Sequence, residues 1–247
     1  LNNTFEPIHV PSYEGPAFPK ILQPAYVISI RPERMKNFVQ RFGPWAMHCK
    51  RVKCVIGKLL NRNALIKDRT IYGNGLKIRM GEIGCFLSHV NAWKAIAAGP
   101  HESGTIFEDD VDIKYENKET VLKQIENAVK ELTDKKVDWD ILYWNISPLP
   151  RARESLQKCD LQHWNAIIHN NKWISCIAYT IKKKVAEHWL TKCTSFDAPV
   201  DVWVRRDFGR FKAFCISPPL GTIVPTSSDT TDVIKPHYLK YLRTTSG

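Results

Sequence analysis

Residues 105–112 read Thr-Ile-Phe-Glu-Asp-Asp-Val-Asp, a short apolar run that ends in a cluster of acids. Thr105–Phe107 combines β-branched and aromatic residues, which predicts a strand. Four carboxylates follow within five residues: Glu108, Asp109, Asp110 and Asp112. In open sheets whose strands alternate with helices, ligands bind beyond the carboxyl ends of the strands. The stretch therefore predicts a strand with a candidate site at its end.

Apolar segments on both sides of this stretch alternate between strand and helix patterns. Ala25–Ile30 predicts a buried parallel strand, and the following Arg31-Pro32-Glu33-Arg34 opens a helix because Pro is favoured in a first turn. Apolar residues recur at three- and four-residue steps from Gly81 to Ala98, which predicts a helix ending at Gly99-Pro100. Further helices are expected through 121–132 and 185–190, and further strands at 140–144, 173–181 and 213–217. This alternation predicts an α/β fold with a mainly parallel central sheet.

The chain divides into an arm and one larger unit. Residues 1–24 hold six Pro or Gly residues without sustained periodicity, which predicts an irregular N-terminal arm. Residues 25–247 show neither a repeat nor a linker, so we expect a single domain there. Within it, residues 147–169 are polar and weakly patterned, which fits either an active-site flap or a long surface excursion.

Composition limits the class of protein. The 247 residues carry 36 Lys+Arg against 25 Asp+Glu, a net charge of +11, and 43% are hydrophobic, as in a globular chain with a substantial core. No apolar run approaches the roughly 20 residues of a membrane-spanning helix, so we expect no transmembrane segment. The basic surplus fits a polyanion partner, an anionic small molecule or solubility alone.

The seven cysteines are an odd number, and several lie in apolar segments. They predict reduced, buried thiols rather than a disulfide framework, and Cys49 and Cys54 lack the second pair of a zinc site. This usage favours a reducing, cytoplasmic location. The sequons Asn2-Asn3-Thr4 and Asn145-Ile146-Ser147 leave a secretory lumen open.

The acid cluster has two interpretations. Neighbouring carboxylates repel one another unless a cation or strong donors hold them, and an oxygen-rich set suits Mg²⁺ or Mn²⁺. Such an ion assists transfer from a diphosphate leaving group by neutralising the charge that develops on it. The alternative is a solvated turn. Phe107 and Val111 favour a strand edge, and no Walker loop, dinucleotide glycine motif or nucleophile elbow is present.

Three blocks resemble glycosyltransferase family 25, which includes lipooligosaccharide and collagen galactosyltransferases. They are Tyr26–Ile30 with the following Arg-Pro-Glu-Arg, Gly81–His89 with Trp93, and Ile106–Val111. Later, Pro199-Val200-Asp201 and Ser228-Asp229 resemble the second half of the family, so the resemblance covers roughly residues 25–235. Thr226-Ser227 depart from it, because the family often has a Gln in that neighbourhood.

The resemblance implies a GT-A type Rossmann-like fold and an inverting transfer of galactose or glucose from a UDP-sugar to a hydroxyl of a glycan or glycosylated acceptor. It implies Mn²⁺ or Mg²⁺ as cofactor, with Asp110 as the first candidate ligand and Asp112 as the second. Glu108 and Asp109 are placed to hold ribose or metal-bound water. Either Asp109 or Asp112 could instead be structural.

The remaining candidates come from other segments. Arg31 and Arg34 follow the first strand, where they meet uracil or diphosphate or are simply exposed at a helix start. Asp201 is the candidate base that deprotonates the acceptor hydroxyl, or else a helix cap. Ser88, paired with His89, is expected in a polar network beside the nucleotide.

Three weaker expectations complete the set. Glu82 is expected to support its helix start, His237 is a further candidate metal ligand, and the loop at 147–172 is expected to select the acceptor.

Two other hypotheses compete with the transferase. A nucleic-acid-binding module would use Lys182-Lys183-Lys184 and Arg205-Arg206, but no zinc-finger, helix-turn-helix or RNA-recognition signature supports it, and we expect no nucleic-acid partner. A catalytically silent GT-A fold would bind a glycan without turnover. The intact Glu-Asp-Asp motif argues against that.

Overall fold

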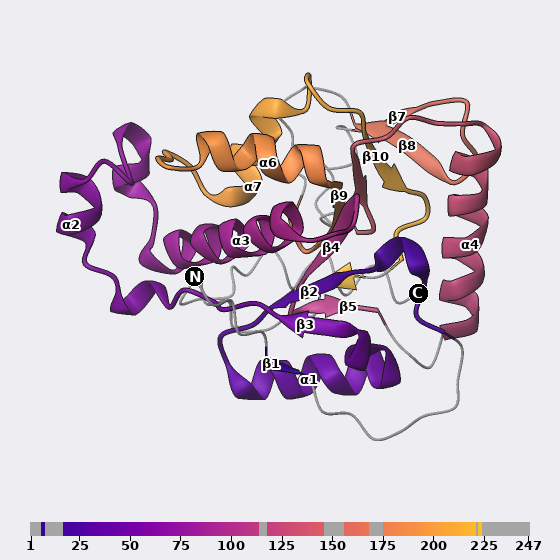
Figure 1. Cartoon of the computed structure of the whole chain (residues 1–247), viewed down its shortest axis with the longest axis horizontal. Coiled ribbons are helices and arrows are strands. Elements are labelled where there is room, and N and C mark those ends of the chain that lie inside the picture. The colour runs from indigo at the N-terminus through magenta and orange to yellow at the C-terminus, as the bar shows by residue number, and fades with distance from the viewer. Residues whose placement is uncertain are drawn as a thin grey trace, which may run out of the picture.

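The computed structural model describes residues 6–7, 17–113, 118–145, 156–167, 175–220 and 222–223 (Figure 1). The strands are β1 (Glu6–Pro7), β2 (Ala25–Ile28), β3 (Cys49–Arg51), β4 (Ser103–Glu108), β5 (Val111–Asp112), β6 (Ile141–Tyr143), β7 (Leu156–Lys158), β8 (Trp164–Ile167), β9 (Ala178–Lys182), β10 (Ala213–Ile216) and β11 (Thr222–Ile223). The helices are α1 (Pro32–Phe42), α2 (Arg62–Lys67), α3 (Met80–Ala98), α4 (Lys118–Asp134), α6 (Lys183–Lys192) and α7 (Val200–Val204). The predicted α/β class is confirmed.

The central sheet has the strand order β1-β3-β2-β4-β9-β6-β10-β8-β7. β2 pairs in parallel with β3 and β4, and β6 pairs in parallel with β10. β9 is inserted antiparallel between β4 and β6, so β3, β2, β4, β6 and β10 share one direction. This arrangement is compatible with a Rossmann-like GT-A fold. It brings the carboxyl ends of β3, β2 and β4 to one edge.

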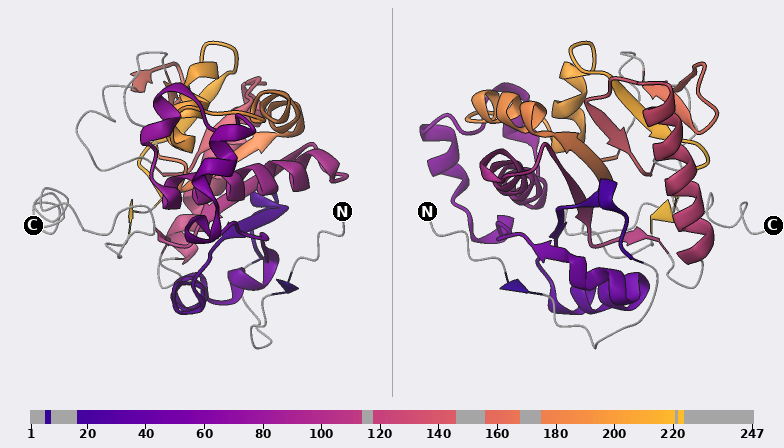
Figure 2. Two further views of the ribbon diagram at one scale, coloured as in Figure 1. Left: turned by 90° about the vertical axis from the view of Figure 1, so that its left-hand side faces the viewer. Right: turned by 45° about the vertical axis from the view of Figure 1, so that its right-hand side comes forward.

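Helices cover both faces of the sheet, because side chains of the buried strands alternate between two cores. Tyr26 and Ile28 join one core with α3, α6 and α7, whereas Ala25 and Val27 join the other with α1 and α4. Figure 2 shows the two layers, with α3 and α6 on one side of the sheet and α1 on the other. The strands are thus buried on both faces, as their continuous apolar runs predict.

Most predicted elements lie where the sequence indicates. The helix expected at 81–98 spans Met80–Ala98, and Pro32 occupies the first turn of α1 as predicted. The weakly patterned stretch contains, in its described part, the antiparallel pair β7 and β8, which extends the sheet edge. Of the arm, Glu6–Pro7 pairs with β3 and Lys20–Leu22 forms a 3-10 helix. The division at residue 24 stays a prediction.

Two expectations from composition can be compared with the structure. All seven cysteines are free, and four of them are buried: Cys49, Cys176, Cys193 and Cys215. The prediction of reduced thiols is therefore confirmed for this structure. Among the described residues, no helix is both long and apolar enough to cross a bilayer.

Candidate active site at the carboxyl ends of β3, β2 and β4

The acids at the end of β4 lie next to the end of β2. Glu108 is in register with Ile28, and the Asp109 amide donates to the Ile28 carbonyl oxygen over 3.2 Å. The chain then turns through Asp109 and Asp110 into β5. The acid cluster thus sits at the edge of the sheet where the sequence predicts a site.

Two arginines from α1 hold this turn. Arg34 forms ion pairs with Asp109 and, at 3.3 Å, with Asp110 Oδ2. Arg41 donates to the carbonyl oxygens of Asp109 (2.6 Å) and Val111 (3.2 Å). Burial lowers the pKa of Arg41, and the nearby aspartates oppose that shift. Two guanidinium groups of α1 therefore act electrostatically on this acid cluster.

Burial raises the pKa values of the central acids. The pKa of Asp110 rises to about 6 and that of Glu108 to about 8, first because burial disfavours their ionised forms and then because neighbouring carboxylates repel. The Glu108 side chain keeps 24% of its surface exposed, so solvent moderates its shift. Asp110 Oδ1 is buried and has no hydrogen-bond partner among the described residues. This oxygen is the candidate ligand atom predicted for Asp110.

A series of hydrogen bonds between buried side chains leads to Glu108 from the core of the protein. The Trp93 indole N–H donates to the Tyr179 hydroxyl over 3.0 Å, and that hydroxyl lies 2.8 Å from His89 Nδ1. His89 Nε2 lies 3.2 Å from Glu108 Oε1. Because burial lowers the His89 pKa to about 3, the ring is neutral. We assign its proton to Nε2, since Trp93 can only donate and the Tyr179 proton then points to Nδ1.

A cavity of about 290 Å³ opens at the ends of β2 and β3. Its lining combines Ser29 and Ile30 from the end of β2 with Arg51, Val52, Lys53, Cys54 and Ile56 from the end of β3. Arg51 Nε and Nη2 both donate to the Ser29 carbonyl oxygen, at 3.1 and 3.0 Å. The guanidinium is thereby fixed between the two strand ends. A basic, concave surface thus lies next to the acid cluster.

Asp201 approaches the same region from α7. It is the second residue of that helix after the N-cap Pro199, and its Oδ1 accepts from the Val202 amide over 2.9 Å. Burial raises its pKa, and Arg205 opposes the shift. Asp201 also raises the pKa of Glu108, so the two carboxylates are electrostatic neighbours. Asp201 therefore accepts a hydrogen bond from a backbone amide of the first turn of α7, although the N-cap residue is Pro199.

Comparison with known proteins places this arrangement in a family. The sequence profile of glycosyltransferase family 25 (LPS biosynthesis protein) matches residues 22–204, well over half of the chain. The chain belongs to glycosyltransferase family 25. The matched region includes α1, the acid cluster and Asp201, so the site described above lies within the family's shared part.

Curated relatives within family 25 include active and inactive proteins. Procollagen galactosyltransferase 1 of Danio rerio is 29% identical over 149 residues, which are 54% of this chain and 24% of the relative. Procollagen galactosyltransferase 1-B of Xenopus laevis is 32% identical over 150 residues, 54% of this chain and 23% of the relative. Probable inactive glycosyltransferase 25 family member 3 of Rattus norvegicus is 28% identical over 127 residues, which are 48% of this chain and 22% of the relative. The match spans about a quarter of each relative.

The family 25 site gathers most of the residues predicted for it. Glu108, Asp109, Asp110 and Arg34 meet at the end of β4, whereas Arg31 is the half-buried N-cap residue of α1. Asp112 lies in β5, opposite Thr222 of β11, and it acts electrostatically on Arg41. The roles predicted for these residues stay predictions.

Two helix residues have structural contacts. Ser88 is buried, donates to the Gly84 carbonyl oxygen (2.7 Å) and accepts from the Val55 amide (2.9 Å). It ties α3 to the segment beside the cavity, which agrees with a packed polar network. Glu82 accepts from the Arg79 amide over 2.8 Å and so supports the start of α3, as expected. His237, Ser228-Asp229 and most of 147–172 lie outside the described residues.

Among the described residues, one group of three side chains gathers its potential metal ligands closely. Ligand atoms of Cys85, His89 and Glu108 lie within 4.8 Å of one another, in the part of the chain that is described. However, His89 already makes a hydrogen bond through each ring nitrogen, and burial keeps the pKa of the Cys85 thiol well above its ordinary value. The carboxylates around Asp110 offer the oxygen atoms that a hard cation prefers, but within the described residues they do not bring three ligand atoms within 4.8 Å of one another.

Four residues of the site were not identified from the sequence: Arg41, Arg51, Lys53 and Tyr179. Arg51 ends β3 and Lys53 follows it, and this three-residue strand is too short for a periodic signal. Arg41 reads as an exposed residue at the end of α1, and Tyr179 as one more apolar strand residue. A basic pair after a strand is the one signal that could have indicated the cavity.

Proposed function

We propose that this chain is a divalent-metal-dependent, inverting glycosyltransferase that moves galactose or glucose from a UDP-sugar to a hydroxyl of a glycan or glycosylated acceptor. Membership of family 25 supports the transferase class. The observation that carries the finer proposal is the partnerless Asp110 Oδ1 within a buried carboxylate cluster beside a basic cavity. That combination suits a cation and a diphosphate together.

The cavity is assigned to the nucleotide end of the donor. Arg51 and Lys53 line it, and their positive charges suit the diphosphate, while Ile30, Val52 and Ile56 supply an apolar wall for the uracil. In this proposal Arg34 holds Asp109 and Asp110 in place and Arg31 stands at the rim. Glu108 and Asp109 contact ribose or metal-bound water.

Asp110 and Asp112 would hold Mn²⁺ or Mg²⁺. The cation would supply charge neutralisation at the leaving diphosphate. Arg34 limits repulsion within the cluster through its contact with Asp110 Oδ2, which leaves Oδ1 available. Because burial and Glu108 raise the pKa of Asp110 to about 6, a bound cation would favour the ionised form near neutral pH.

Asp201 is assigned as the base. It accepts the proton of the acceptor hydroxyl while the oxygen of that hydroxyl bonds to the anomeric carbon and the bond to the UDP oxygen breaks. Burial raises the pKa of Asp201. The raised pKa lies closer to neutral pH and makes the carboxylate a stronger base. Its electrostatic contact with Glu108 supports a position next to the donor.

A catalytically silent fold is the second candidate, because family members described as inactive match at a similar identity to the galactosyltransferases. The chain keeps the Glu-Asp-Asp motif, which favours activity. Both candidates predict donor binding, but only the transferase predicts turnover.

The deciding experiment screens UDP-galactose, UDP-glucose and other UDP-sugars for slow hydrolysis to UDP, with Mn²⁺, with Mg²⁺ and with EDTA. We expect UDP release from a UDP-hexose that EDTA abolishes and Mn²⁺ restores. Binding of the donor without UDP release in any condition would support the silent fold. Release that is unaffected by EDTA would contradict the metal dependence.

A further inference from the structure

Residues 56–79, here called the basic lobe, project from the body of the molecule. They contain α2 and two 3-10 helices, Gly57–Leu59 and Gly73–Lys77. Figure 1 shows α2 at the end of the molecule opposite α4, outside both helix layers. α2 buries none of its residues. Its half-buried Leu65 packs against the core, so α2 has only a narrow apolar contact, although packing of an apolar face supplies most helix stability.

The lobe exposes apolar side chains at high density. Six large hydrophobic residues are exposed in the described part of the chain, and five of them belong to this lobe: Ile56, Leu59, Ile66, Tyr72 and Leu76. Leu59 has 79% of its surface exposed. Single exposed apolar residues are common on protein surfaces, but their concentration in one segment marks an interaction surface.

The same lobe is strongly basic. It carries six Lys or Arg residues against one acid, Asp68, a net charge of +5 out of the chain's +11: Lys58, Arg62, Lys67, Arg69, Lys77 and Arg79. Asp68 is engaged by Thr70, whose amide and hydroxyl donate to its Oδ1 over 3.0 and 2.6 Å. Arg62 donates to the carbonyl oxygens of Leu76 and Ile78, which leaves its charge uncompensated. The surface is therefore both apolar and cationic.

The lobe is nevertheless firmly attached to the body. Ile71 is buried and bridges to Phe196, and the Tyr72 amide donates to the Phe196 carbonyl oxygen over 3.4 Å. At Gly57 a Cβ would lie 1.8 Å from the Met80 carbonyl oxygen, so the backbones approach as closely as only glycine allows. The exposed side chains thus belong to an ordered, anchored segment.

We propose that the basic lobe docks on the surface of a lipid bilayer rich in anionic phospholipids. Exposed Leu and Ile side chains among Lys and Arg residues are the pattern of segments that lie in the membrane interface, with apolar groups at the acyl boundary and cations at the phosphates. A soluble anionic polymer would satisfy the charges but would leave Leu59 and Leu76 in water. The combination therefore favours a lipid surface over a polyanion.

This inference goes beyond the proposed transfer reaction and does not depend on it. The lobe does have a fixed relation to the site, because Ile56 lines the cavity and Phe196 lies five residues before Asp201. Docking through the lobe would therefore hold the cavity mouth near the bilayer surface.

The test is sedimentation of the full chain with vesicles of phosphatidylcholine, with and without phosphatidylglycerol. We expect binding only to the anionic vesicles, and weaker binding as salt rises, because exposed charges are screened. Absence of binding to the anionic vesicles at low salt would overturn the proposal.

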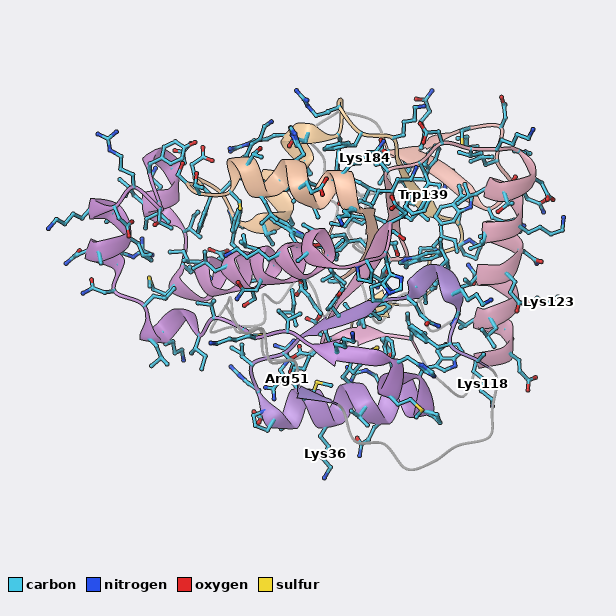
Figure 3. The ribbon with its side chains drawn as sticks, viewed as in Figure 1. Lys36, Arg51, Lys118, Lys123, Trp139 and Lys184 are labelled. Atoms are coloured by element: carbon cyan, nitrogen blue, oxygen red, sulfur yellow. The ribbon has the colours of Figure 1, made fainter. Side chains whose placement is uncertain are left out.

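A matched pair of triple variants then locates the contact. Lys58→Gln/Lys67→Gln/Lys77→Gln removes three charges from the lobe, and Lys36→Gln/Lys94→Gln/Lys123→Gln removes three exposed lysines elsewhere. Figure 3 shows Lys36 on α1 and Lys123 on α4, away from α2. At roughly fivefold per lysine near the surface, the lobe variant should bind the vesicles about 10²-fold more weakly, and the control only a few-fold more weakly. Equal losses would contradict the assignment.

A charge-neutral variant separates lipid from polyanion. Leu59→Ser/Leu76→Ser keeps every charge, and both side chains are exposed, so circular dichroism and the melting temperature should not change. We expect at least a tenfold loss of vesicle binding, about twofold or less for heparin as a soluble polyanion, and unchanged UDP-sugar hydrolysis. Undiminished vesicle binding by this variant would show an electrostatic surface for anionic polymers instead of a membrane contact.

Discussion

Two acidic clusters in this chain have opposite environments. At the end of β4, Asp109 is buried, and the other three acids, Glu108, Asp110 and Asp112, are half-buried. Burial raises the pKa values of Glu108 and Asp110, and Asp110 Oδ1 has no hydrogen-bond partner among the described residues. Asp138 and Asp140, by contrast, are bridged by Lys182, Lys184 and Lys212.

The lysine contacts explain the opposite pKa shifts. Lys212 and Lys182 lower the pKa of Asp138 to about 2 through direct hydrogen bonds. Figure 3 labels Lys184 and Trp139 in the same upper part of the view, and Trp139 lies between Asp138 and Asp140 in the sequence. An acid cluster whose counter-charges come from its own chain is structural. The β4 cluster has Arg34 as an ion-pair partner but keeps an Asp110 oxygen without a hydrogen-bond partner among the described residues, and it is the candidate site for a ligand.

The largest expected effect separates the two clusters directly. Asp110→Asn should lower metal-dependent UDP release roughly 10³-fold or more, because several kcal/mol of charge stabilisation at the leaving group depend on the cation. Asp138→Asn removes the same charge from the lysine-paired cluster and should leave the rate unchanged. Initial rates with saturating Mn²⁺ measure both. Equal rates for the two variants would remove the functional distinction.

Asp201 is a further carboxylate, outside both clusters, that has no lysine partner among the described residues. Asp201→Asn should lower transfer to the acceptor about 10²-fold or more, because the acceptor hydroxyl loses its base. Donor affinity should remain, as the cavity is untouched. Transfer rates and UDP-sugar titration test this pair of expectations. A normal transfer rate would assign Asp201 to stabilisation of α7 alone.

The next effect concerns the hydrogen-bonded chain behind Glu108. Tyr179→Phe removes one hydroxyl and leaves the Trp93 indole and His89 Nδ1 unpaired in the core, which should cost about 1–3 kcal/mol of unfolding free energy. Tyr72→Phe, at an exposed site, is the matched control and should change little. Urea denaturation measures both. An unchanged denaturation midpoint for Tyr179→Phe would show that the hydrogen bonds among Trp93, Tyr179 and His89 contribute no net stability.

The smallest effect is the pH dependence of stability in EDTA. A carboxyl whose pKa is raised on folding binds more protons in the folded state. The metal-free protein should therefore lose stability as the pH rises from about 4 to about 8, through Asp110 and Glu108. Asp110→Asn should flatten this fall. Asp138 has the opposite sign, and its contribution is lost as pH falls below about 4.

Melting temperatures measured across this pH range report both effects. Added Mn²⁺ should reduce the loss of stability with rising pH that comes from Asp110 and Glu108. A fall of the same steepness in Asp110→Asn would show that Asp110 does not titrate as described.

Local pattern was sufficient where one segment decides its own structure. The short runs Ala25–Ile30 and Thr105–Phe107 predicted β2 and β4, and three- and four-residue steps predicted α3 within one residue. The β7–β8 pair was missed because its burial alternates weakly, and β7 has no fully buried residue. The basic lobe was missed because α2 is six residues long and has no fully buried residue, which is too little for a periodic apolar signal.

The sequence alone determined the α/β alternation, the acid cluster after β4 and the family blocks, because each lies in a continuous stretch with its own periodicity or motif. Only the tertiary structure decided which basic residues pair with which acids. The lysines that contact Asp138 lie 44 and 74 residues further along the chain, and Arg34 lies 75 residues before Asp109. Charge balance is set by distances in space, and a linear pattern does not contain them.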